Sequence, residues 1–159
     1  MQIYILRHGI AETARAGMSD ADRALVPEGK RKLRAVLGRA RAAGVSLTVI
    51  LTSPYRRAVE SAEIAAEVLR YDGEIMTADA LRPGGSPEEV WEEIRRLWSS
   101  RRLLLSGHEP LLSYLAAYLL GTPSLLIDLK KGSLMRIDLR EAIPRPRGVL
   151  RWYLTPKLA

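Results

Sequence analysis

Short apolar segments alternate with longer, helix-like segments along most of this 159-residue chain. Residues 2–6, 47–52, 74–77 and 102–106 are the apolar segments, and each has the length and composition of a strand buried in a sheet. Between them, apolar residues recur every three or four positions, which indicates helices with one buried face. The alternation predicts an α/β fold: a three-layer α/β/α sandwich with a mostly parallel central sheet.

Four helices are expected, over about residues 27–44, 53–69, 86–98 and 111–120. Ser53-Pro54 predicts a helix start, because serine can cap exposed N–H groups and proline fits the first turn. Ser86 and Glu89 form a capping box with Pro87 at the first helical position. The chain ends in two strand-like runs, residues 133–139 and 149–154. We expect these as neighbouring or edge strands that give the sheet an antiparallel C-terminal strand.

The chain contains no cysteine and only two histidines. Disulfides, thiol nucleophiles and cysteine-ligated metal sites are therefore excluded. A histidine-rich metal site is not expected, although a carboxylate-based one stays open. The length suits one domain over residues 1–159, and no apolar run approaches the roughly 20 residues that span a bilayer. We therefore expect a single cytoplasmic domain without membrane contact.

Basic residues outnumber acidic ones by 25 to 18, which gives a formal net charge of +7. Such an excess is typical of nucleic-acid-binding proteins, because Lys and Arg neutralise phosphates. Here the cations are scattered along the chain and form no basic tail, so we expect most of them to be solvated surface and nucleic acid not to be the main partner. The lack of cysteine and asparagine suggests a thermophilic source.

Both histidines follow predicted parallel strands. His8 comes directly after the first strand and His108 directly after the fourth. The carboxyl ends of parallel strands meet at one edge of a sheet, where α/β proteins bind ligands. Arg7 adjoins the first histidine, and Arg56 and Arg57 begin the helix after the second strand. Two imidazoles, guanidinium groups and helix N-termini at one edge indicate a site for a phosphoryl group.

These residues lie in motifs that resemble, in order and spacing, those of the histidine phosphatase (phosphoglycerate mutase-like) superfamily. The three main motifs are Arg7-His8-Gly9, Ser53-Pro54-Tyr55-Arg56-Arg57-Ala58-Val59-Glu60-Ser61-Ala62 and Gly107-His108-Glu109-Pro110. Leu25-Val26-Pro27-Glu28-Gly29 is similar to that family's Leu-Thr-x-x-Gly helix start. Lys131-Gly132-Ser133 and Trp152-Tyr153-Leu154 resemble its final strand pair, so the resemblance covers nearly the whole chain.

The resemblance implies that His8 accepts the phosphoryl group and that a covalent phosphohistidine intermediate is hydrolysed by water. It also implies no metal ion or other cofactor. An unperturbed histidine pKa of about 6.5 leaves enough neutral imidazole for this attack at neutral pH. Arg56 falls at a variable position and is expected on the surface or the rim of the site. The residues implied to bind the phosphoryl group are Arg7, Gly9, Arg57 and His108.

Residues 81–86, the loop after the third strand, contain no carboxylate. The family's phosphomonoesterases usually place Glu or Asp there to protonate an alkoxide leaving group. A phosphorylated imidazole leaves more easily, because its conjugate acid has a pKa near 6.5. The Leu-x-Pro-x-Gly pattern of this loop and the short chain resemble the SixA type, the small phosphohistidine protein phosphatases. Four other carboxylates are candidates for a general acid: Glu12, Asp79, Glu88 and Glu109.

The resemblance to the SixA type implies a phosphoprotein substrate, and an open site with a basic rim favours an acidic one. One alternative is a phosphomonoesterase of the same superfamily that acts on a small phosphorylated metabolite, such as a sugar or nucleotide phosphate. Another is a noncatalytic module that binds phosphate or nucleic acid. The sequence does not indicate an oligomeric state.

Overall fold

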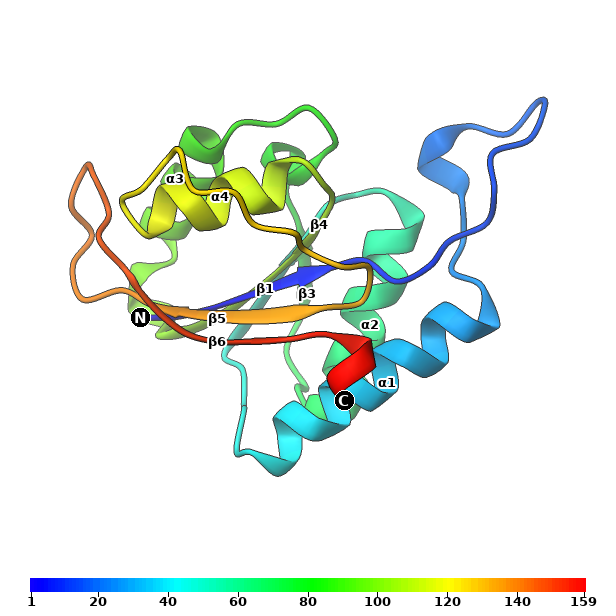
Figure 1. The fold of residues 1–159 in the computed structure, drawn as a ribbon, viewed down its shortest axis with the longest axis horizontal. Helices are drawn as coiled ribbons and strands as arrows, with labels where there is room; N and C mark the ends of the chain where they lie inside the picture. The colour runs from blue at the N-terminus through cyan, green and yellow to red at the C-terminus, as the bar shows by residue number, and fades with distance from the viewer.

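The computed structural model describes residues 1–159, arranged around a six-stranded sheet with the strand order β3-β2-β4-β1-β5-β6 (Figure 1). The first four of these strands pair in parallel, whereas β5 and β6 join the sheet by antiparallel pairings. This confirms the predicted mostly parallel sheet with an antiparallel C-terminal part. The strands are β1 (Gln2–Arg7), β2 (Val49–Thr52), β3 (Ile75–Thr77), β4 (Arg102–Gly107), β5 (Leu134–Asp138) and β6 (Val149–Leu154).

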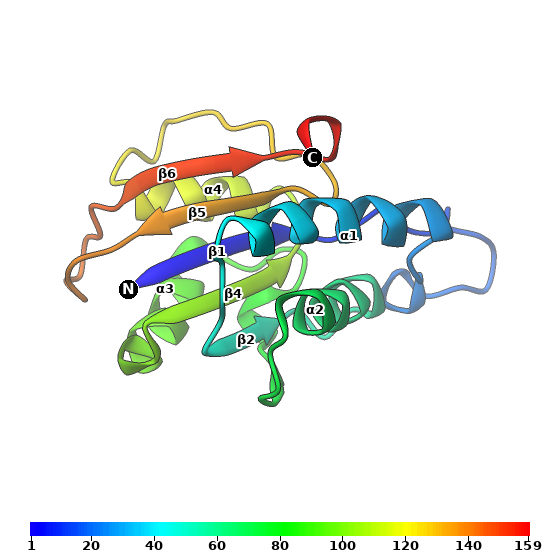
Figure 2. The same cartoon turned by 90° about the horizontal axis from the view of Figure 1, so that it is seen from below.

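Helices cover both faces of the sheet (Figure 2). On one face α1 (Pro27–Ala42) packs beside α2 (Arg56–Leu69), and on the other α3 (Pro87–Arg96) packs beside α4 (Leu111–Leu119). None of these helices has the length and apolar character needed to cross a membrane. Four short 3-10 helices complete the fold: η1 (Asp20–Asp22), η2 (Asp79–Leu81), η3 (Trp98–Ser100) and η4 (Pro156–Leu158).

Side chains of the central strand β1 alternate between two separate cores. Ile3 and Ile5 pack with α3 and α4, whereas Tyr4 and Leu6 pack with α1 and α2. Successive side chains of a strand point to opposite faces, so an uninterrupted apolar strand needs apolar cover on both sides. The apolar sequence of β1 therefore accounts for the three layers, as predicted.

One predicted helix start is wrong. Helix α2 begins at Arg56, and the residue before it, Tyr55, caps the helix without a side-chain hydrogen bond. The Ser53 hydroxyl lies 2.7 Å from Nε2 of His108 and also accepts a hydrogen bond from the Tyr55 N–H. Ser53 thus bonds a histidine from another strand end, which local helix-start rules do not take into account.

The other helix signals hold. The capping box at Ser86 and Glu89 is present, with both reciprocal hydrogen bonds, and Pro87 is the first helical residue of α3. Helix α3 ends at Arg96, two residues earlier than expected, and the chain continues into η3.

Three neighbouring strands end level at one edge of the sheet. The last residues of β1 and β4, Arg7 and Gly107, are register partners, as are Thr52 of β2 and Ser106 of β4. The residues that follow these strands therefore emerge side by side, although up to 100 positions separate them in the sequence.

Candidate active site

His8 is buried at the end of β1, with 7% of its surface exposed. Its Nδ1 lies 2.7 Å from the carbonyl oxygen of Gly9. A carbonyl can only accept, so Nδ1 carries the proton and Nε2 holds the lone pair. The guanidinium Nε of Arg57 donates to this Nε2 over 3.3 Å. His8 is thus a neutral imidazole with an oriented, unprotonated nitrogen beside a cation.

His108 lies next to His8, with 5.0 Å between the ring centroids. One of its ring nitrogens, Nε2, is bonded to the Ser53 hydroxyl, and the other, Nδ1, is buried without a hydrogen-bond partner. The ring of Tyr55 packs edge-on against the His108 ring, with 5.3 Å between the two ring centroids. An unpaired buried polar group costs about 1–3 kcal/mol, so Nδ1 offers a hydrogen bond that a bound oxyanion could complete.

The three arginines named by the sequence differ sharply in exposure. The side chain of Arg57 is 6% exposed, whereas that of Arg56 is 58% exposed and pairs with Glu60 on the surface of α2. Arg7 donates one hydrogen bond to the Leu129 carbonyl over 2.6 Å, and its Nε is buried without a partner. The structure brings Arg57 to His8 and leaves Arg56 in solvent, as the motif alignment predicts.

Both imidazoles are held neutral. Burial lowers the pKa of His8 to about 4, and the positive charges of Arg57, Arg7 and Lys131 add to this effect. The pKa of His108 is lowered to about 3, first by burial and then by its neighbours His8 and Arg57. The cations that disfavour an imidazolium here also favour a bound phosphoryl dianion. Nearly all of both imidazoles is therefore neutral at pH 7, compared with about three quarters for an imidazole with the ordinary pKa of about 6.5.

Packing around Gly9 gives a reason for a glycine that does not involve the phosphate. Its N–H donates to the Ser61 hydroxyl over 3.2 Å, and its carbonyl accepts the proton of His8, so both backbone groups are already used within the protein. A Cβ at this position would lie 2.8 Å from Leu33 Cδ1 and 3.2 Å from the Gly29 carbonyl oxygen. Close packing against α1 is therefore a second reason for the glycine, beside the expectation that it lets the backbone pass close to a phosphate.

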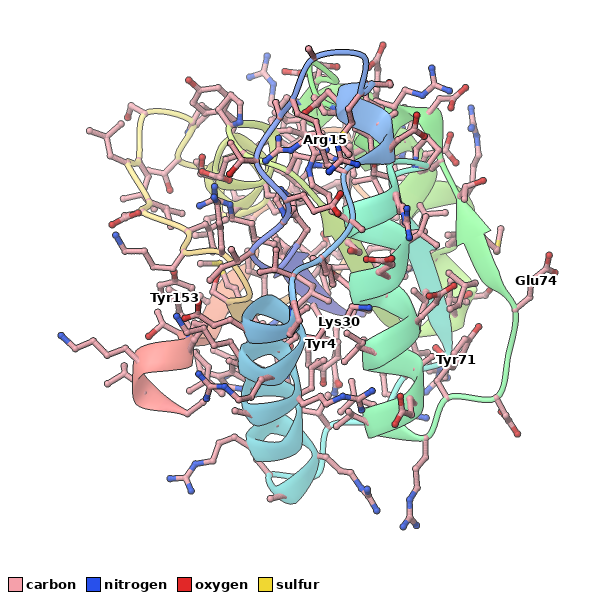
Figure 3. The ribbon with its side chains drawn as sticks, turned by 90° about the vertical axis from the view of Figure 1, so that its right-hand side faces the viewer. Tyr4, Arg15, Lys30, Tyr71, Glu74 and Tyr153 are labelled. Carbon is pink, nitrogen blue, oxygen red and sulfur yellow. The ribbon has the colours of Figure 1, made fainter.

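A carboxylate outside the sequence motifs reaches the site. Asp20 begins η1 in the loop between β1 and α1, and Arg57 donates to its backbone oxygen over 2.7 Å and to Oδ2 over 3.1 Å. Arg23 donates to the other carboxylate oxygen over 2.9 Å. The hydrogen bond from Arg23, with a further contribution from Arg57, holds the pKa of Asp20 below its usual range. Figure 3 shows this loop, in which Arg15 is labelled, beside the beginning of α2.

The carboxylates proposed from the sequence as general acids are engaged or exposed elsewhere. Glu12 accepts the Ala24 N–H over 3.1 Å, which ties the two ends of the β1–α1 loop together. Glu109 accepts the Ser113 N–H over 2.9 Å in the first turn of α4. No three His, Asp or Glu side chains lie together in a way that could hold a metal ion. The other two candidate acids are exposed, one in η2 and the other in the first turn of α3: Asp79 and Glu88.

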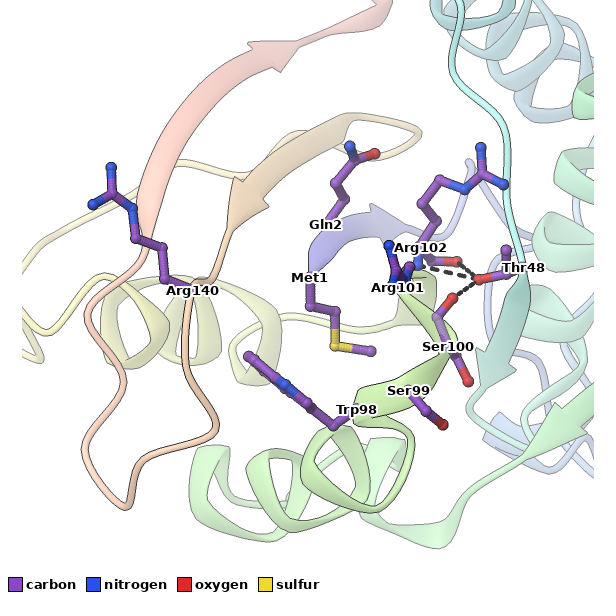
Figure 4. A pocket seen from close by; sticks show the side chains of 9 residues that line it. All are labelled: Met1, Gln2, Thr48, Trp98, Ser99, Ser100, Arg101, Arg102 and Arg140. Carbon is purple, nitrogen blue, oxygen red and sulfur yellow. Dashed lines mark hydrogen bonds between the residues drawn. The ribbon is translucent and has the colours of Figure 1, made fainter.

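Two basic hollows lie near opposite ends of the parallel strands. The one beside the histidines, here called the lysine groove, has a volume of about 860 Å³. The other, here called the arginine hollow, has a volume of about 980 Å³ and lies where β1 and β4 begin (Figure 4). The lysine groove is lined by Arg7, Ile10, Lys32, Lys130, Lys131, Thr155, Pro156 and Lys157. The arginine hollow is lined by Met1, Gln2, Thr48, Trp98, Ser99, Ser100, Arg101, Arg102 and Arg140.

The chain matches known proteins over most of its length. The sequence model of the histidine phosphatase superfamily (branch 1) matches residues 3–82. An uncharacterized protein of Picosynechococcus sp. is 33% identical over 147 residues, which cover 91% of this chain and 88% of that protein.

Solved structures share the fold. The protein histidine phosphatase SixA complexed with tungstate superposes with a TM-score of 0.87 at 26% identity, and the match covers 99% of this chain and 98% of that one. A mycobacterial glucosyl-3-phosphoglycerate phosphatase superposes with a TM-score of 0.71 at 18% identity over 94% of this chain and 96% of its own, which shows the fold alone. With its motifs in place around two buried histidines, the chain belongs to the histidine phosphatase superfamily and is of the SixA type.

Proposed function

We propose that this phosphatase hydrolyses phosphohistidine on a protein, through a covalent intermediate on His8 and without a metal ion. Arg7, Arg57 and His108 bind the phosphoryl group. The observation that carries the proposal is that no carboxylate at the site is free to act as an acid. Asp20, the one that reaches Arg57, is bonded to two guanidinium groups and holds no proton to give.

The first step is attack on phosphorus by Nε2 of His8. Its lone pair forms the new N–P bond while the P–N bond to the substrate imidazole breaks, and that bonding pair stays on the departing nitrogen. With its other nitrogen protonated, the substrate leaves as neutral imidazole. The guanidinium groups of Arg7 and Arg57 stabilise the negative charge on the three nonbridging oxygens, and so does the free Nδ1–H of His108, whose Nε2 accepts from the Ser53 hydroxyl.

The second step returns the enzyme to its starting state. A water oxygen attacks the phosphorus of phospho-His8, the P–Nε2 bond breaks, and its electron pair returns to the nitrogen. The products are neutral His8 and orthophosphate, which keeps both protons of the attacking water as H2PO4−. The proton on Nδ1 stays with its Gly9 hydrogen bond throughout, so the ring keeps its orientation between the two steps.

The leaving group decides between the candidate substrates. An alkoxide needs a proton from an acid, and Glu12, Glu109 and Asp20 each use a carboxylate oxygen in a hydrogen bond within the protein. An imidazole has a conjugate-acid pKa near 6.5 and departs without such help. This arrangement favours phosphohistidine over sugar or nucleotide esters, and the similarity to SixA points the same way.

The surface beside the site suits a macromolecular substrate. The lysine groove continues from Arg7 along α1 to the C-terminal turn η4 and contains four lysines and no acidic residue. Such a surface attracts an acidic protein segment next to the phosphorylated residue. The same groove leaves a small substrate open to solvent on that side.

Single-turnover assays with a phosphohistidine-containing protein, a sugar phosphate and a nucleotide at equal concentration test this function. We expect the phosphohistidine protein to lose its phosphate at least about 100-fold faster than either ester, because general-acid help is worth roughly that much or more. Activity should persist in excess EDTA. Equally fast hydrolysis of the sugar phosphate would contradict the proposal and favour the small-molecule phosphomonoesterase. Phosphate or nucleic-acid binding without any turnover would favour the noncatalytic alternative.

A further inference from the structure

The guanidinium of Arg57 is bonded on two sides. On one side its Nε–H points to Nε2 of His8 over 3.3 Å. At its end, the two terminal nitrogens donate to the backbone oxygen and to Oδ2 of Asp20 over 2.7 and 3.1 Å. A guanidinium has five N–H groups, so these three bonds leave two for a ligand. The end that Asp20 occupies is not the side that faces the nucleophile.

This arrangement matters because arginine side chains have many rotamers. A buried arginine that binds a phosphoryl group must present the same N–H groups each time a ligand arrives. The ring of Tyr55 lies 5.2 Å from Cζ of Arg57 and limits movement on one face only. Besides the bond to His8, the hydrogen bonds that orient the guanidinium within its own plane come from Asp20.

Asp20 is in turn held by its own loop. Arg23 donates to Oδ1 of Asp20 over 2.9 Å and, through Nε, to the Glu12 carbonyl over 2.6 Å. The Glu12 carboxylate accepts the Ala24 N–H, and Glu60 of α2 accepts the Leu25 N–H over 2.7 Å, so the base of the loop is closed and tied to the helix that carries Arg57. The β1–α1 loop is thus built to hold one carboxylate against Arg57.

We propose that Asp20 is a positioning residue, which fixes the end of the Arg57 guanidinium so that its Nε side faces the phosphoryl group bound at His8. Asp20 acts on the reaction only through Arg57. This inference rests on the proposed roles of His8 and Arg57, but not on the identity of the substrate. It assigns a function to a carboxylate that the motifs of the chain do not include.

The test compares Asp20→Ala, Asp20→Asn and the control Asp22→Ala, which removes an exposed carboxylate from the same short helix. Orthophosphate affinity is measured by calorimetry, and kcat/KM is measured over pH with a small phosphoramidate. Asp20→Ala keeps the backbone acceptor but removes the Oδ2 bond to Arg57 and the bond from Arg23 that holds the loop in place. We expect it to lower both quantities roughly 10- to 100-fold, since misplacing a binding group costs about that much. Asp20→Asn keeps an acceptor for Arg57 and should regain most of the loss, and the control should stay within twofold of wild type.

The same substitution in an Arg57→Ala background separates positioning from direct chemistry. If Asp20 acts only through Arg57, adding Asp20→Ala to Arg57→Ala changes kcat/KM less than twofold. The pH limits of kcat/KM should also stay where they are in the wild type. Equal losses in both backgrounds, or a pH limit that disappears, would assign Asp20 an independent acid role and overturn the inference. Tighter orthophosphate binding by Asp20→Ala would overturn it as well, because Asp20 would then compete with the ligand.

Calorimetry also keeps this inference separate from the function proposed above. Orthophosphate binding needs no turnover, so it reports on Asp20 even if the substrate is an ester. Normal turnover by His8→Ala would contradict the proposed function. Unchanged orthophosphate affinity in Asp20→Ala, with turnover intact, would contradict only the role of Asp20.

Discussion

The two ends of the central sheet are both basic and hollow, yet they are built differently. Where β1 and β4 begin, Arg101 and Arg140 of the arginine hollow are exposed side chains. Where these strands end, the whole residues His8, Arg57 and His108 are only 7%, 5% and 2% exposed. His8 and Arg57 are hydrogen-bonded to each other, Arg57 is also bonded to Asp20, and His108 is bonded to Ser53. Both ends of the sheet carry positive charge. Only at the carboxyl ends of the strands are the charged and titratable side chains buried and held by hydrogen bonds.

The direction of the chain explains much of this difference. In parallel α/β units, helices begin near the carboxyl ends of strands and end near the opposite edge. Helix N-termini attract anions and helix C-termini attract cations. Arg39 and Arg41 lie in the last turn of α1, and Arg95 and Arg96 in the last turn of α3. Basic residues near the amino edge therefore fit the helix dipoles, and their number alone does not indicate a ligand.

Removing the nucleophile should produce the largest effect. We expect His8→Ala to lower turnover by at least about 10⁴-fold, because the other neutral imidazole at the site, that of His108, has its Nε2 bonded to Ser53 and is not free to attack. Acid-labile phosphate should no longer accumulate on the protein in rapid-quench experiments with labelled substrate. Near-normal turnover would show that the carboxyl edge is not the catalytic end of the sheet.

Arg56 and Arg57 are adjacent in α2 and carry the same charge, but only Arg57 is buried. Substituting each one separately shows whether burial or charge matters for activity. Arg57→Ala should lower kcat/KM by roughly 10²- to 10³-fold, the usual loss when a donor to the transition state is removed. Arg56→Ala removes the same charge from an exposed position and should cost less than about threefold. Steady-state kinetics of both variants, with thermal unfolding as a check on folding, makes the comparison. Similar losses would mean that overall charge, and not the buried contact, drives binding.

The lowered histidine pKa values predict an acid-sensitive fold. Unfolded histidines titrate near pH 6.5, whereas the folded His8 and His108 titrate at about 4 and 3. The unfolded chain therefore binds more protons between these values, and the free energy of unfolding should fall as the pH drops from 6.5 towards 4, by roughly 3 kcal/mol for each histidine. Urea unfolding at pH 7, 5.5 and 4.5 measures this change.

His108→Gln should remove part of that pH dependence and is the matched control for it. Catalysis should be insensitive to His8 titration above about pH 5, because the nucleophile stays neutral there. A drop in kcat/KM centred near pH 6.5 would indicate an ordinary, solvated imidazole and would contradict the burial seen here.

Removing charge from the lysine groove or from the arginine hollow should have the smallest effect on activity. It compares the two ends of the sheet directly. Lys32→Ala combined with Lys157→Ala, in the lysine groove, should raise KM for an acidic phosphohistidine protein about tenfold and leave a small phosphoramidate within twofold. Arg101→Ala with Arg140→Ala removes two charges from the arginine hollow and should change neither. If both pairs weaken protein binding equally, long-range attraction and not the groove selects the substrate.

Much of the fold could be predicted because its signals are local. Apolar periodicity placed every strand within about two residues of its observed ends, and the capping box gave the start of α3. The start of α2 was wrong because Ser53 bonds His108, a residue 55 positions away, instead of capping its own helix. The packing of Leu33 against Gly9 was likewise not predicted, because Leu33 lies 24 positions further along the chain.

The residues of the site were predictable to the extent that they belong to motifs at strand ends. Asp20 was not, because its partner Arg57 lies 37 positions away and only the loop geometry joins them. The spacing of Asp20 and Arg23, one 3-10 turn apart, was the available signal, since side chains three residues apart line up in such a turn. Exposed pairs of this spacing are common, so it did not point to a site.

The sequence by itself determined the order of strands and helices, the two-sided burial of the sheet and the placing of both histidines after parallel strands. These follow from periodicity, because side-chain direction within an element depends on a few neighbouring residues. Tertiary structure alone decided the neutral state of His8, its tautomer and the contact of Asp20 with Arg57. Burial and charge at one point sum over segments from the whole chain, and only the fold brings those segments together.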